Sequence, residues 1–368
     1  MGAIANPLPL RVTALTRYGR QGASSRVRMY QYEEALGRAG IVLQVQPFLD
    51  DNYVEALRRG QRRMSAVLNA YLRRVTTMLR RVPCDLLWVE KECFPWLPAS
   101  FERLMLGAKM PVVLDYDDAV FHQYDQHRFA AVRSLLGDKL TYLQRRASLV
   151  LAGNQYLADY AEQNGACRVE ILPSVIDLDR YSVSPPVPTD AATNLPVVGW
   201  IGQRSTAGYL SIVAPLAREF AARGRARFIA LGGPPELLDE PFEAAAWNER
   251  EEVQRLRQFS IGIMPLRDGL FERGKCGYKL IQYMACGLPV VASSVGVNRT
   301  IVEHGVNGFL ADTPAEWKQA LEQLLASPAL RMQMGMAGRR KVESLYSVQA
   351  NAPRIAAWFH DVASRQEP

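Results

Sequence analysis

The sequence predicts an α/β protein with two doubly wound parallel sheets, one in each half of the chain. Short apolar runs alternate with segments of helical spacing along residues 1–180 and again along 197–347, and this alternation is typical of parallel sheets. A span rich in Ser, Pro and Thr separates the two series at residues 181–196 and is the predicted linker. The length of 368 residues and the apolar content of 48% suffice for two separate cores.

The first half contains five predicted strands. They cover residues 10–14, 41–45, 85–89, 112–114 and 149–152. Each is an apolar run of strand length, and a segment of helical spacing at residues 25–39 joins the first two. Residues 1–180 are therefore predicted to form the first domain.

The second half repeats the pattern in residues 197–347. Its predicted strands cover residues 197–201, 227–231, 260–264 and 289–293, and its predicted helices cover 209–223, 249–258, 278–286 and 314–346. A last helix is predicted at 348–364. Because ligands bind beyond the carboxyl ends of parallel strands, we expect the two domains to face each other across a cleft.

Residues 273–310 contain the strongest functional signal, an anion-binding turn. Gly274 and Gly277 precede the helix predicted at 278–286. Glycines there let a diphosphate approach the backbone, and the helix dipole favours negative charge at that end. Lys275 and Lys279 flank the turn, although the chain has only seven lysines. An exposed helix start with two solvated lysines is the alternative that these residues leave open.

The order of motifs in this segment resembles the donor-binding half of GT-B glycosyltransferases of family 4, the group 1-like glycosyl transferases. The resemblance rests on Met-Ala-Cys-Gly at 284–287, Leu-Pro-Val-Val-Ala-Ser at 288–293, Gly296, and Glu303 before Gly-Val-Asn-Gly-Phe at 305–309. It implies two Rossmann-like domains that face each other across a cleft, with residues 197–347 binding the donor. It also implies that residues 348–368 cross back to the first, acceptor-side domain.

The chain departs from the family at two positions of its donor motif. Two glutamates that are usual in the family fall on Gly274 and Gln282 of this chain, and Gly277 matches the last glycine of the motif. In the family the second glutamate holds the ribose hydroxyls, and an amide at Gln282 still accepts and donates such hydrogen bonds. Gly274 cannot replace the first glutamate, so we expect Lys275 to bind the diphosphate instead.

The activity that the resemblance implies is transfer of a sugar, with retention of configuration, from a nucleotide-diphosphate sugar to an acceptor hydroxyl. Bacterial polysaccharide or glycolipid synthesis is the expected setting. Cleavage builds negative charge on the diphosphate, which Lys275, Lys279 and Arg204 are expected to stabilise. The remaining predicted donor contacts are Gly202 and Thr206 in the turn after residues 197–201, together with Glu252 and Glu303. An N-terminal helix cap at Ser205 or Thr206 is the plainer interpretation of that turn.

Two further function classes stay open at this point. A sugar-nucleotide epimerase of the same fold would bind the donor without an acceptor. A protein that binds nucleic acid through its basic surface is disfavoured, because the arginines lack interleaved stacking residues or a known binding motif.

Two segments of the first half are predicted to border the acceptor. The turn at residues 16–28 carries Gly22, Ala23, Ser24 and Arg26, and the family has a glycine-rich loop there. Its alternative interpretation is a helix capped by Ser24 or Ser25 with solvated arginines.

The second acceptor-side segment is Asp115-Tyr116-Asp117-Asp118, which follows a predicted strand. Crowded carboxylates raise at least one pKa and need a cationic partner or a function. The family's His-Asp pair aligns with Asp117 and Asp118, so Asp117 is expected to hydrogen-bond the acceptor or the sugar. Metal binding by these carboxylates is the competing interpretation. The resemblance implies that neither a metal nor a tightly bound cofactor is required.

The remaining composition indicates a cytoplasmic protein. Five cysteines lack metal-ligand spacing, the N-terminus lacks a signal-peptide pattern, and no run approaches the roughly 18 apolar residues of a membrane span. Residues 58–81 alternate arginine pairs with apolar residues. This pattern fits a basic helix on the anionic inner face of the plasma membrane, with a lipid-linked acceptor, or a core-facing stripe with solvated arginines. The net charge of +7 favours anionic surfaces in general.

Overall fold

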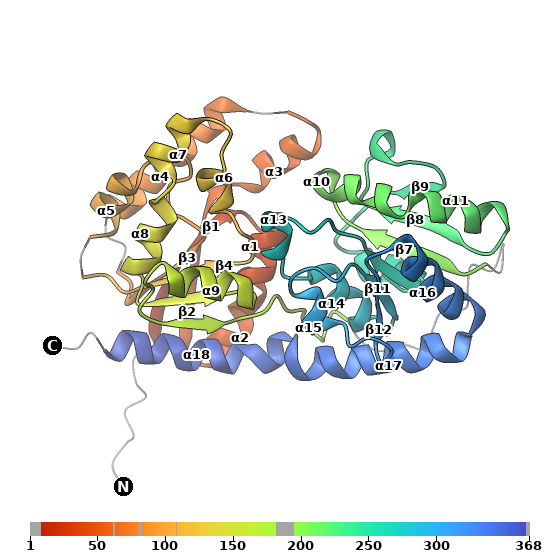
Figure 1. Cartoon of the computed structure of the whole chain (residues 1–368). Helices are drawn as coiled ribbons and strands as arrows, with labels where there is room; N and C mark the ends of the chain where they lie inside the picture. Colours follow the sequence, from red (N-terminus) through yellow and green to blue (C-terminus); the bar gives the residue numbers. More distant parts are fainter. Residues whose placement is uncertain (1–8, 62, 81–82, 108, 182–194, 366–368) are drawn as a thin grey trace, which may run out of the picture. The chain divides into compact units, whose positions relative to one another are not determined.

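The computed structural model describes residues 9–61, 63–80, 83–107, 109–181 and 195–365. The chain divides into two compact units, one of residues 1–174 with 348–368 and one of residues 175–347 (Figure 1). The boundary falls before the predicted linker at 181–196, most of which lies outside the described residues.

The first unit contains a six-stranded parallel sheet in the order β2-β1-β3-β4-β5-β6. Its strands are β1 (Leu10–Tyr18), β2 (Ile41–Leu49), β3 (Leu86–Glu90), β4 (Val112–Tyr116), β5 (Leu149–Ala152) and β6 (Val169–Ile171). The central strands β3, β4 and β5 are buried along their whole length, because helices cover both faces of a doubly wound sheet. This order confirms the predicted fold class, although the sequence prediction omits β6.

The helices of the first unit differ from the prediction at two places. They are α1 (Ala23–Arg28), α2 (Glu33–Arg38), α3 (Asp51–Arg58), α4 (Met64–Leu79), α5 (Ala99–Leu106), α6 (His122–Asp125), α7 (Ala130–Leu136), α8 (Lys139–Arg146), α9 (Gln155–Gln163) and α18 (Val348–Ser364). The single helix predicted at 25–39 is wrong, because the 3-10 turn η1 (Tyr30–Tyr32) divides it. A continuous helix over 58–81 is also wrong, because the chain turns at Gly60, whose φ is 75°.

The last helix, α18, packs on the first unit. Phe359 meets the buried ring of Trp88 of β3 edge-on, with the ring centroids 5.1 Å apart. Arg354 donates to the carbonyl of Ile171 at 3.0 Å. Figure 1 shows α18 running along α2, which it contacts.

The second unit contains another six-stranded parallel sheet, in the order β12-β11-β10-β7-β8-β9. The strands are β7 (Val197–Ile201), β8 (Arg227–Leu231), β9 (Phe242–Ala245), β10 (Ile261–Met264), β11 (Val290–Ala292) and β12 (Gly308–Leu310). The sequence prediction omits β9 and β12. The strand order again matches the predicted doubly wound class.

The helices of the second unit surround two apolar clusters, which contain Trp200, Trp317 and Tyr283. They are α10 (Arg204–Ala207), η2 (Gly208–Ile212), α11 (Ala214–Ala222), η3 (Pro235–Leu237), α12 (Glu252–Leu256), α13 (Leu270–Arg273), α14 (Tyr278–Ala285), α15 (Asn298–Ile301), α16 (Pro314–Ala326) and α17 (Pro328–Leu345). The helix predicted at 314–346 is two helices, because Ser327 caps a new one that starts at Pro328.

Among the helices that the structure describes, none has the length and apolar content that crossing a bilayer requires. Helix α4 nevertheless exposes an apolar stripe. Ala70 and Arg74 are buried on one side of this helix, whereas Met64, Leu68 and Leu72 are exposed on another. The apolar residues of the segment are therefore shared between the core and the surface.

Candidate functional site

The turn before α14 has the geometry of an anion-binding helix start. Gly277 adopts a left-handed conformation with φ of 64°, and a Cβ there would lie 2.3 Å from Cδ1 of Ile301. Only glycine fits both conditions. The N-cap residue Gly277 has no side chain with which to cap α14. The first turn of α14 carries the positive end of the helix dipole, which favours negative charge.

The two predicted lysines lie on aromatic rings of the same unit. Lys275 Nζ is 4.8 Å from the centroid of the Phe271 ring, and Lys279 Nζ is 5.2 Å from that of Trp200. Both side chains are half-buried and lie against a ring rather than extending freely into solvent. Cation–π contacts of this kind orient an ammonium group without neutralising its charge.

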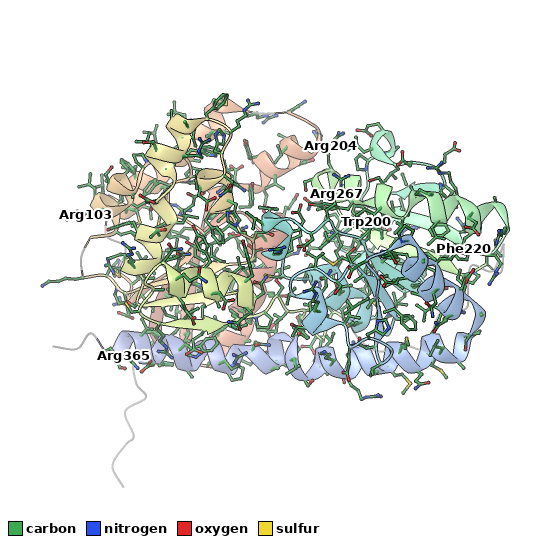
Figure 2. The ribbon with its side chains drawn as sticks, viewed as in Figure 1. Arg103, Trp200, Arg204, Phe220, Arg267 and Arg365 are labelled. Atoms are coloured by element: carbon green, nitrogen blue, oxygen red, sulfur yellow. The ribbon has the colours of Figure 1, made fainter. Side chains whose placement is uncertain are left out.

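The turn after β7 holds the other predicted donor residues. Arg204, labelled in Figure 2, opens α10 as an exposed side chain. It pairs with Glu236. Thr206 Oγ1 donates to the carbonyl of Gln203 and accepts from its N–H, so the N-cap is Gln203 rather than Ser205 or Thr206. A Cβ on Gly202 would lie 2.2 Å from the Trp200 ring, which explains the glycine.

Glu252 and Gln282 are brought together through a third residue. Tyr181 donates its hydroxyl to Glu252 at 2.8 Å and accepts from the Gln282 amide at 3.0 Å. Trp247 donates to the other carboxylate oxygen of Glu252 at 2.7 Å. All but Trp247 are buried, and burial raises the pKa of Tyr181 well above its ordinary value.

The last two predicted donor positions are peripheral to this hydrogen-bond chain. Gly274 ends α13 in a right-handed conformation and is buried. Glu303 is exposed in the turn before β12, where its N–H donates to Asn307 Oδ1 at 2.9 Å.

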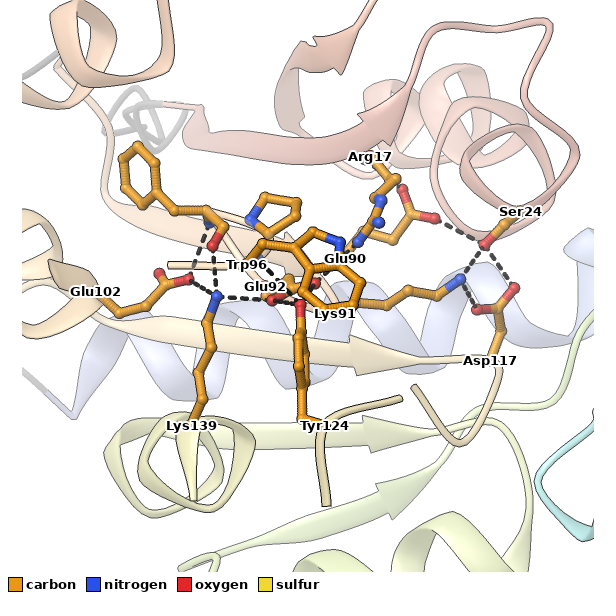
Figure 3. A network of polar contacts seen from close by, with 12 residues as sticks. Arg17, Ser24, Glu90, Lys91, Glu92, Trp96, Glu102, Asp117, Tyr124 and Lys139 are labelled. Atoms are coloured by element: carbon orange, nitrogen blue, oxygen red, sulfur yellow. Dashed lines mark hydrogen bonds and ion pairs between the residues drawn. The ribbon is translucent and has the colours of Figure 1, made fainter. Parts of the chain in front are cut away.

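The first unit contains a polar network at the carboxyl ends of β1, β3 and β4 (Figure 3). Ser24 Oγ lies 2.7 Å from Glu90 Oε1 and 2.6 Å from Asp117 Oδ2. Lys91 Nζ lies 3.0 Å from Ser24 Oγ and 2.8 Å from Asp117 Oδ1. Parallel strands end at one edge of the sheet, so these residues meet although α1 is far from β4 in sequence.

Charges in this network set two pKa values. Burial alone would raise the pKa of Asp117, but the charges of Lys91 and Arg28 outweigh it and hold this pKa below its ordinary value. Burial alone would lower the pKa of Lys91, but Asp117 opposes it and keeps this pKa above its ordinary value. Both groups are therefore charged at neutral pH.

The other carboxylates of the predicted Asp cluster have different environments. Asp115 is fully buried and accepts from Arg28 Nε at 2.7 Å and Nη2 at 3.2 Å. Burial raises its pKa to about 6, against the effect of Arg28. Asp118 is half-buried. Within the residues described, no group of three or more His, Cys, Asp or Glu side chains is arranged to hold a metal ion.

The turn at residues 16–28 is more buried than the sequence suggests. Gly22 precedes α1, and a Cβ there would lie 2.3 Å from Cβ of Tyr18. Ala23 and Ser24 are half-buried, and Arg26 is buried. The alternative of serine caps with solvated arginines is wrong, because neither serine caps α1 and both contact Glu90.

The network continues away from Asp117 through residues that the sequence analysis missed. Glu92 pairs with Arg17 at 2.9 Å and Lys139 at 2.7 Å, and it accepts from the Tyr124 hydroxyl. Lys139 also pairs with buried Glu102 at 3.1 Å. The signal for these residues is Glu90-Lys91-Glu92, three charges in sequence at the end of a buried strand.

The second unit matches a known family. Residues 195–327 match the family described as glycosyl transferases group 1. The chain is 30% identical over 157 residues to a D-inositol 3-phosphate glycosyltransferase of Thermobispora bispora, across 42% of this chain and 32% of that protein. It is 36% identical over 69 residues to human alpha-1,3/1,6-mannosyltransferase ALG2, across 18% of this chain and 16% of that protein. The first match thus spans about a third of the relative's length.

Solved structures match almost the whole chain. Sucrose-phosphate synthase from Thermosynechococcus elongatus has a TM-score of 0.71 at 16% identity and covers 97% of this chain and 100% of its own. Anabaena HepE, solved with UDP and glucose, has a TM-score of 0.68 at 16% identity. The match covers 95% of this chain and 99% of the HepE chain. The chain therefore has the GT-B fold of two Rossmann-like domains, and its residues 195–327 match the group 1 glycosyl transferases.

Proposed function

We propose that this chain is a retaining glycosyltransferase of family 4 with a variant donor motif. It moves a sugar from a nucleotide-diphosphate sugar to an acceptor hydroxyl, in bacterial polysaccharide or glycolipid synthesis. One observation carries the proposal. The stretch that matches the glycosyl transferases contains a left-handed Gly277 between Lys275 and Lys279 at the start of α14. A diphosphate needs this combination of close backbone approach and positive charge.

The reaction breaks the bond between the anomeric carbon and the phosphate oxygen and forms one between that carbon and the acceptor oxygen. The hydroxyl proton passes to the departing diphosphate. Negative charge grows on the diphosphate, so Lys275, Lys279 and Arg204 stabilise the transition state more than the bound substrate. Arg204 can leave Glu236 and bind the diphosphate, because an exposed ion pair contributes little stability. No metal and no tightly bound cofactor are required in this scheme.

The other donor contacts follow from their positions. Gly202 and Gly274 offer backbone groups to the donor, and Thr206 and Glu303 offer it polar side-chain atoms. Gln282 contributes its amide oxygen to the ribose while its nitrogen remains on Tyr181. Glu252 supports the same tyrosine.

The acceptor is assigned to the first unit. Asp117 accepts a hydrogen bond from the reacting hydroxyl, and Gly22, Ala23, Ser24, Arg26 and Asp118 border it. The acceptor itself is a saccharide or a lipid-linked saccharide.

Helix α4 supports the lipid-linked choice and a peripheral position on the inner face of the plasma membrane. Its stripe of Met64, Leu68, Leu72 and Leu79 is 74%, 61%, 59% and 67% exposed. Exposed Arg63 and Arg80 stand at the two ends of the helix. An apolar stripe with flanking cations complements an anionic bilayer, and the net charge of +7 adds long-range attraction.

The two alternatives of the sequence analysis gain no specific support. The relatives and structures named above carry transferase or synthase names, or contain UDP, so no observation favours an epimerase. Nucleic-acid binding would need exposed stacking residues among the arginines of α4. The one aromatic residue of that helix, Tyr71, is half-buried against Phe48.

A thermal-shift screen against UDP, GDP, ADP and TDP, each with and without a sugar, tests the donor site. One nucleotide is expected to raise Tm of the wild type, since a ligand at about 100 times its Kd adds about 2.7 kcal/mol of stability. Lys275→Ala should lose most of this shift. Lys318→Ala is the matched control, because Lys318 lies in the same unit and pairs with Glu219 on the surface. Equal shifts in Lys275→Ala and the control would refute the site.

A further inference from the structure

The hydroxyl of Ser24 has three polar neighbours and only one proton. Glu90 Oε1 lies at 2.7 Å, Asp117 Oδ2 at 2.6 Å and Lys91 Nζ at 3.0 Å. A serine hydroxyl donates one hydrogen bond and accepts two, and an ammonium group only donates. Lys91 therefore fills one accepting position of Ser24, and the proton of Ser24 serves one carboxyl group. The second carboxyl group can bond to Ser24 only if it is the donor, which means that it holds a proton.

The remaining contacts identify which carboxyl group holds this proton. Asp117 has Lys91 Nζ at 2.8 Å on its other oxygen, and the ammonium charge stabilises the anion. Among the described residues Glu90 forms no ion pair with a lysine or arginine, although it interacts electrostatically with Lys91 and Arg74. Its Oε2 accepts from the N–H of Arg17 at 2.7 Å and from Ser25 Oγ at 2.6 Å, so Oε1 is the oxygen left to carry the proton. The Arg17 side chain pairs instead with Glu92.

The backbone of Lys91 indicates that its position is specifically built. Lys91 is buried and has a φ of 65°, a left-handed conformation that a residue with a side chain rarely adopts. Its N–H donates to the carbonyl of Asp115 at 2.9 Å. Strained residues of this kind persist where the surroundings determine them, and they cluster at functional sites. The strain aims the ammonium at the end of β4.

We propose that Lys91 is a positioning residue. Together with Ser24 it keeps Asp117 ionised, so that Asp117 accepts a hydrogen bond from the hydroxyl group to which the sugar is transferred. The neighbouring Glu90 keeps a proton. The role of Asp117 rests on the proposed function, whereas the proton on Glu90 does not. Several charged and titratable groups surround Asp117. Glu90 is the last residue of β3 and Lys91 follows it, Arg28 belongs to α1, Asp115 belongs to β4, and Asp118 lies in the turn after β4.

Infrared difference spectroscopy of the full chain tests the proton location without any ligand. The spectrum of wild type minus Glu90→Gln should contain the C=O band of a protonated carboxyl group. The spectrum of Asp117→Asn minus the double variant Asp117→Asn with Glu90→Gln should lack it, because the competing carboxylate is gone and the proton of Ser24 is left for Glu90. Buried Glu102 is unchanged in these variants, so its band cancels. Asp115 senses the charges of Glu90 and Asp117 and has a pKa of about 6, so the spectra are taken about two pH units above that value, where Asp115 is ionised throughout. The assignment is overturned if the band is absent from the first difference or appears in the second.

UDP release from UDP-glucose, with water as the acceptor, tests the positioning role across pH. Lys91→Met should lower kcat roughly a hundredfold, the cost of a misplaced catalytic group, with little change in KM. It should also move the acid limb of the profile to higher pH, because Asp117 loses its cation. Lys91→Arg should restore the position of this limb. An acid limb that stays in place in Lys91→Met would overturn the role.

A second pair of variants separates the proposed effect from an effect of misfolding. Ser24→Ala removes the link between Glu90 and Asp117, whereas Ser25→Ala removes a bond to Glu90 alone. Ser24→Ala should shift the acid limb more than Ser25→Ala, and equal shifts would count against the proposal. If the wild type releases no UDP, it does not use UDP-glucose as its donor, and the infrared bands alone decide the inference.

Discussion

The ammonium group of Lys279 lies 5.2 Å from the centroid of the Trp200 ring. Trp200 is buried in β7, and Lys279 belongs to the first turn of α14. The contact fixes a positive charge from the helix start over a strand whose following turn carries Arg204. The cations predicted for the donor diphosphate therefore have a defined geometric link within the second unit.

Replacing Lys279 tests this link. Lys279→Met removes the charge but keeps an apolar chain on Trp200, so the free energy of unfolding should change by only about 1 kcal/mol. Affinity for the stabilising nucleotide should fall about tenfold, since a charged hydrogen bond contributes about 1.5–3 kcal/mol. Calorimetric titration measures the affinity. An unchanged affinity with a normal melting curve would remove Lys279 from the site.

Gly277 should tolerate no side chain, for two separable reasons. Gly277→Ala meets both the left-handed strain and a clash with Ile301, so it should cost more than 2 kcal/mol, with strain alone at about 1 kcal/mol. Gly287→Ala is the matched control, because Gly287 has a φ of 73° and open space around its missing Cβ. Chemical denaturation measures both. Equal costs would mean that the contact with Ile301 relaxes freely.

Arg204 and Glu236 should have unequal effects although they form one ion pair. Removing either should change stability by less than about 1 kcal/mol, because the pair is exposed. Arg204→Ala should weaken nucleotide binding, whereas Glu236→Ala should leave it unchanged or tighten it by freeing Arg204. Parallel binding curves for the two variants check this prediction. If both weaken binding alike, Arg204 acts only through the ion pair.

Asp117 should stabilise the first unit in a pH-dependent manner. Its pKa is lower in the folded state than the ordinary value of about 3.9. The stabilising effect is therefore present above that value and is lost as pH falls through the folded pKa. Asp117→Asn leaves Lys91 without its ion-pair partner, so at pH 7 it should cost about 3 kcal/mol. Urea unfolding at several pH values should show this difference shrinking toward low pH, and a growing difference would contradict the ion pair.

The exposed stripe of α4 should determine membrane binding. Leu68→Ser with Leu72→Ser should reduce flotation with vesicles that contain phosphatidylserine, because each buried leucine contributes about 1.5–3 kcal/mol. Met332→Ser is the control, because Met332 is 57% exposed on α17 of the other unit. Neutral vesicles should bind less than anionic ones. Equal flotation of the double variant and the control would remove α4 as the membrane contact.

The sequence predicted the sheets well because long buried strands have a clear apolar signal. It missed β6, β9 and β12, which lie at sheet edges and whose half-buried or exposed positions interrupt the apolar run. The equally short β5, β10 and β11 were predicted because every residue in them is buried. It also joined α16 to α17, because the apolar spacing continues past Ser327 and only the cap marks the break.

The two candidate sites also differ in how far the sequence alone predicts them. The turn proposed to bind the donor stands out in the sequence because its glycines and lysines are adjacent. Ser24 and Glu90 are 66 residues apart, and only the pairing of β1 with β3 brings them together. Their contact, and hence the role of Lys91, required the structure.

Calorimetric titration of the wild type and Lys275→Ala with UDP, GDP, ADP and TDP tests the central claim, a nucleotide-diphosphate site at the start of α14. We predict that one nucleotide binds the wild type at a single site and that Lys275→Ala weakens it about tenfold or more. Binding of none of the four nucleotides, or equal binding by the wild type and Lys275→Ala, would contradict the claim.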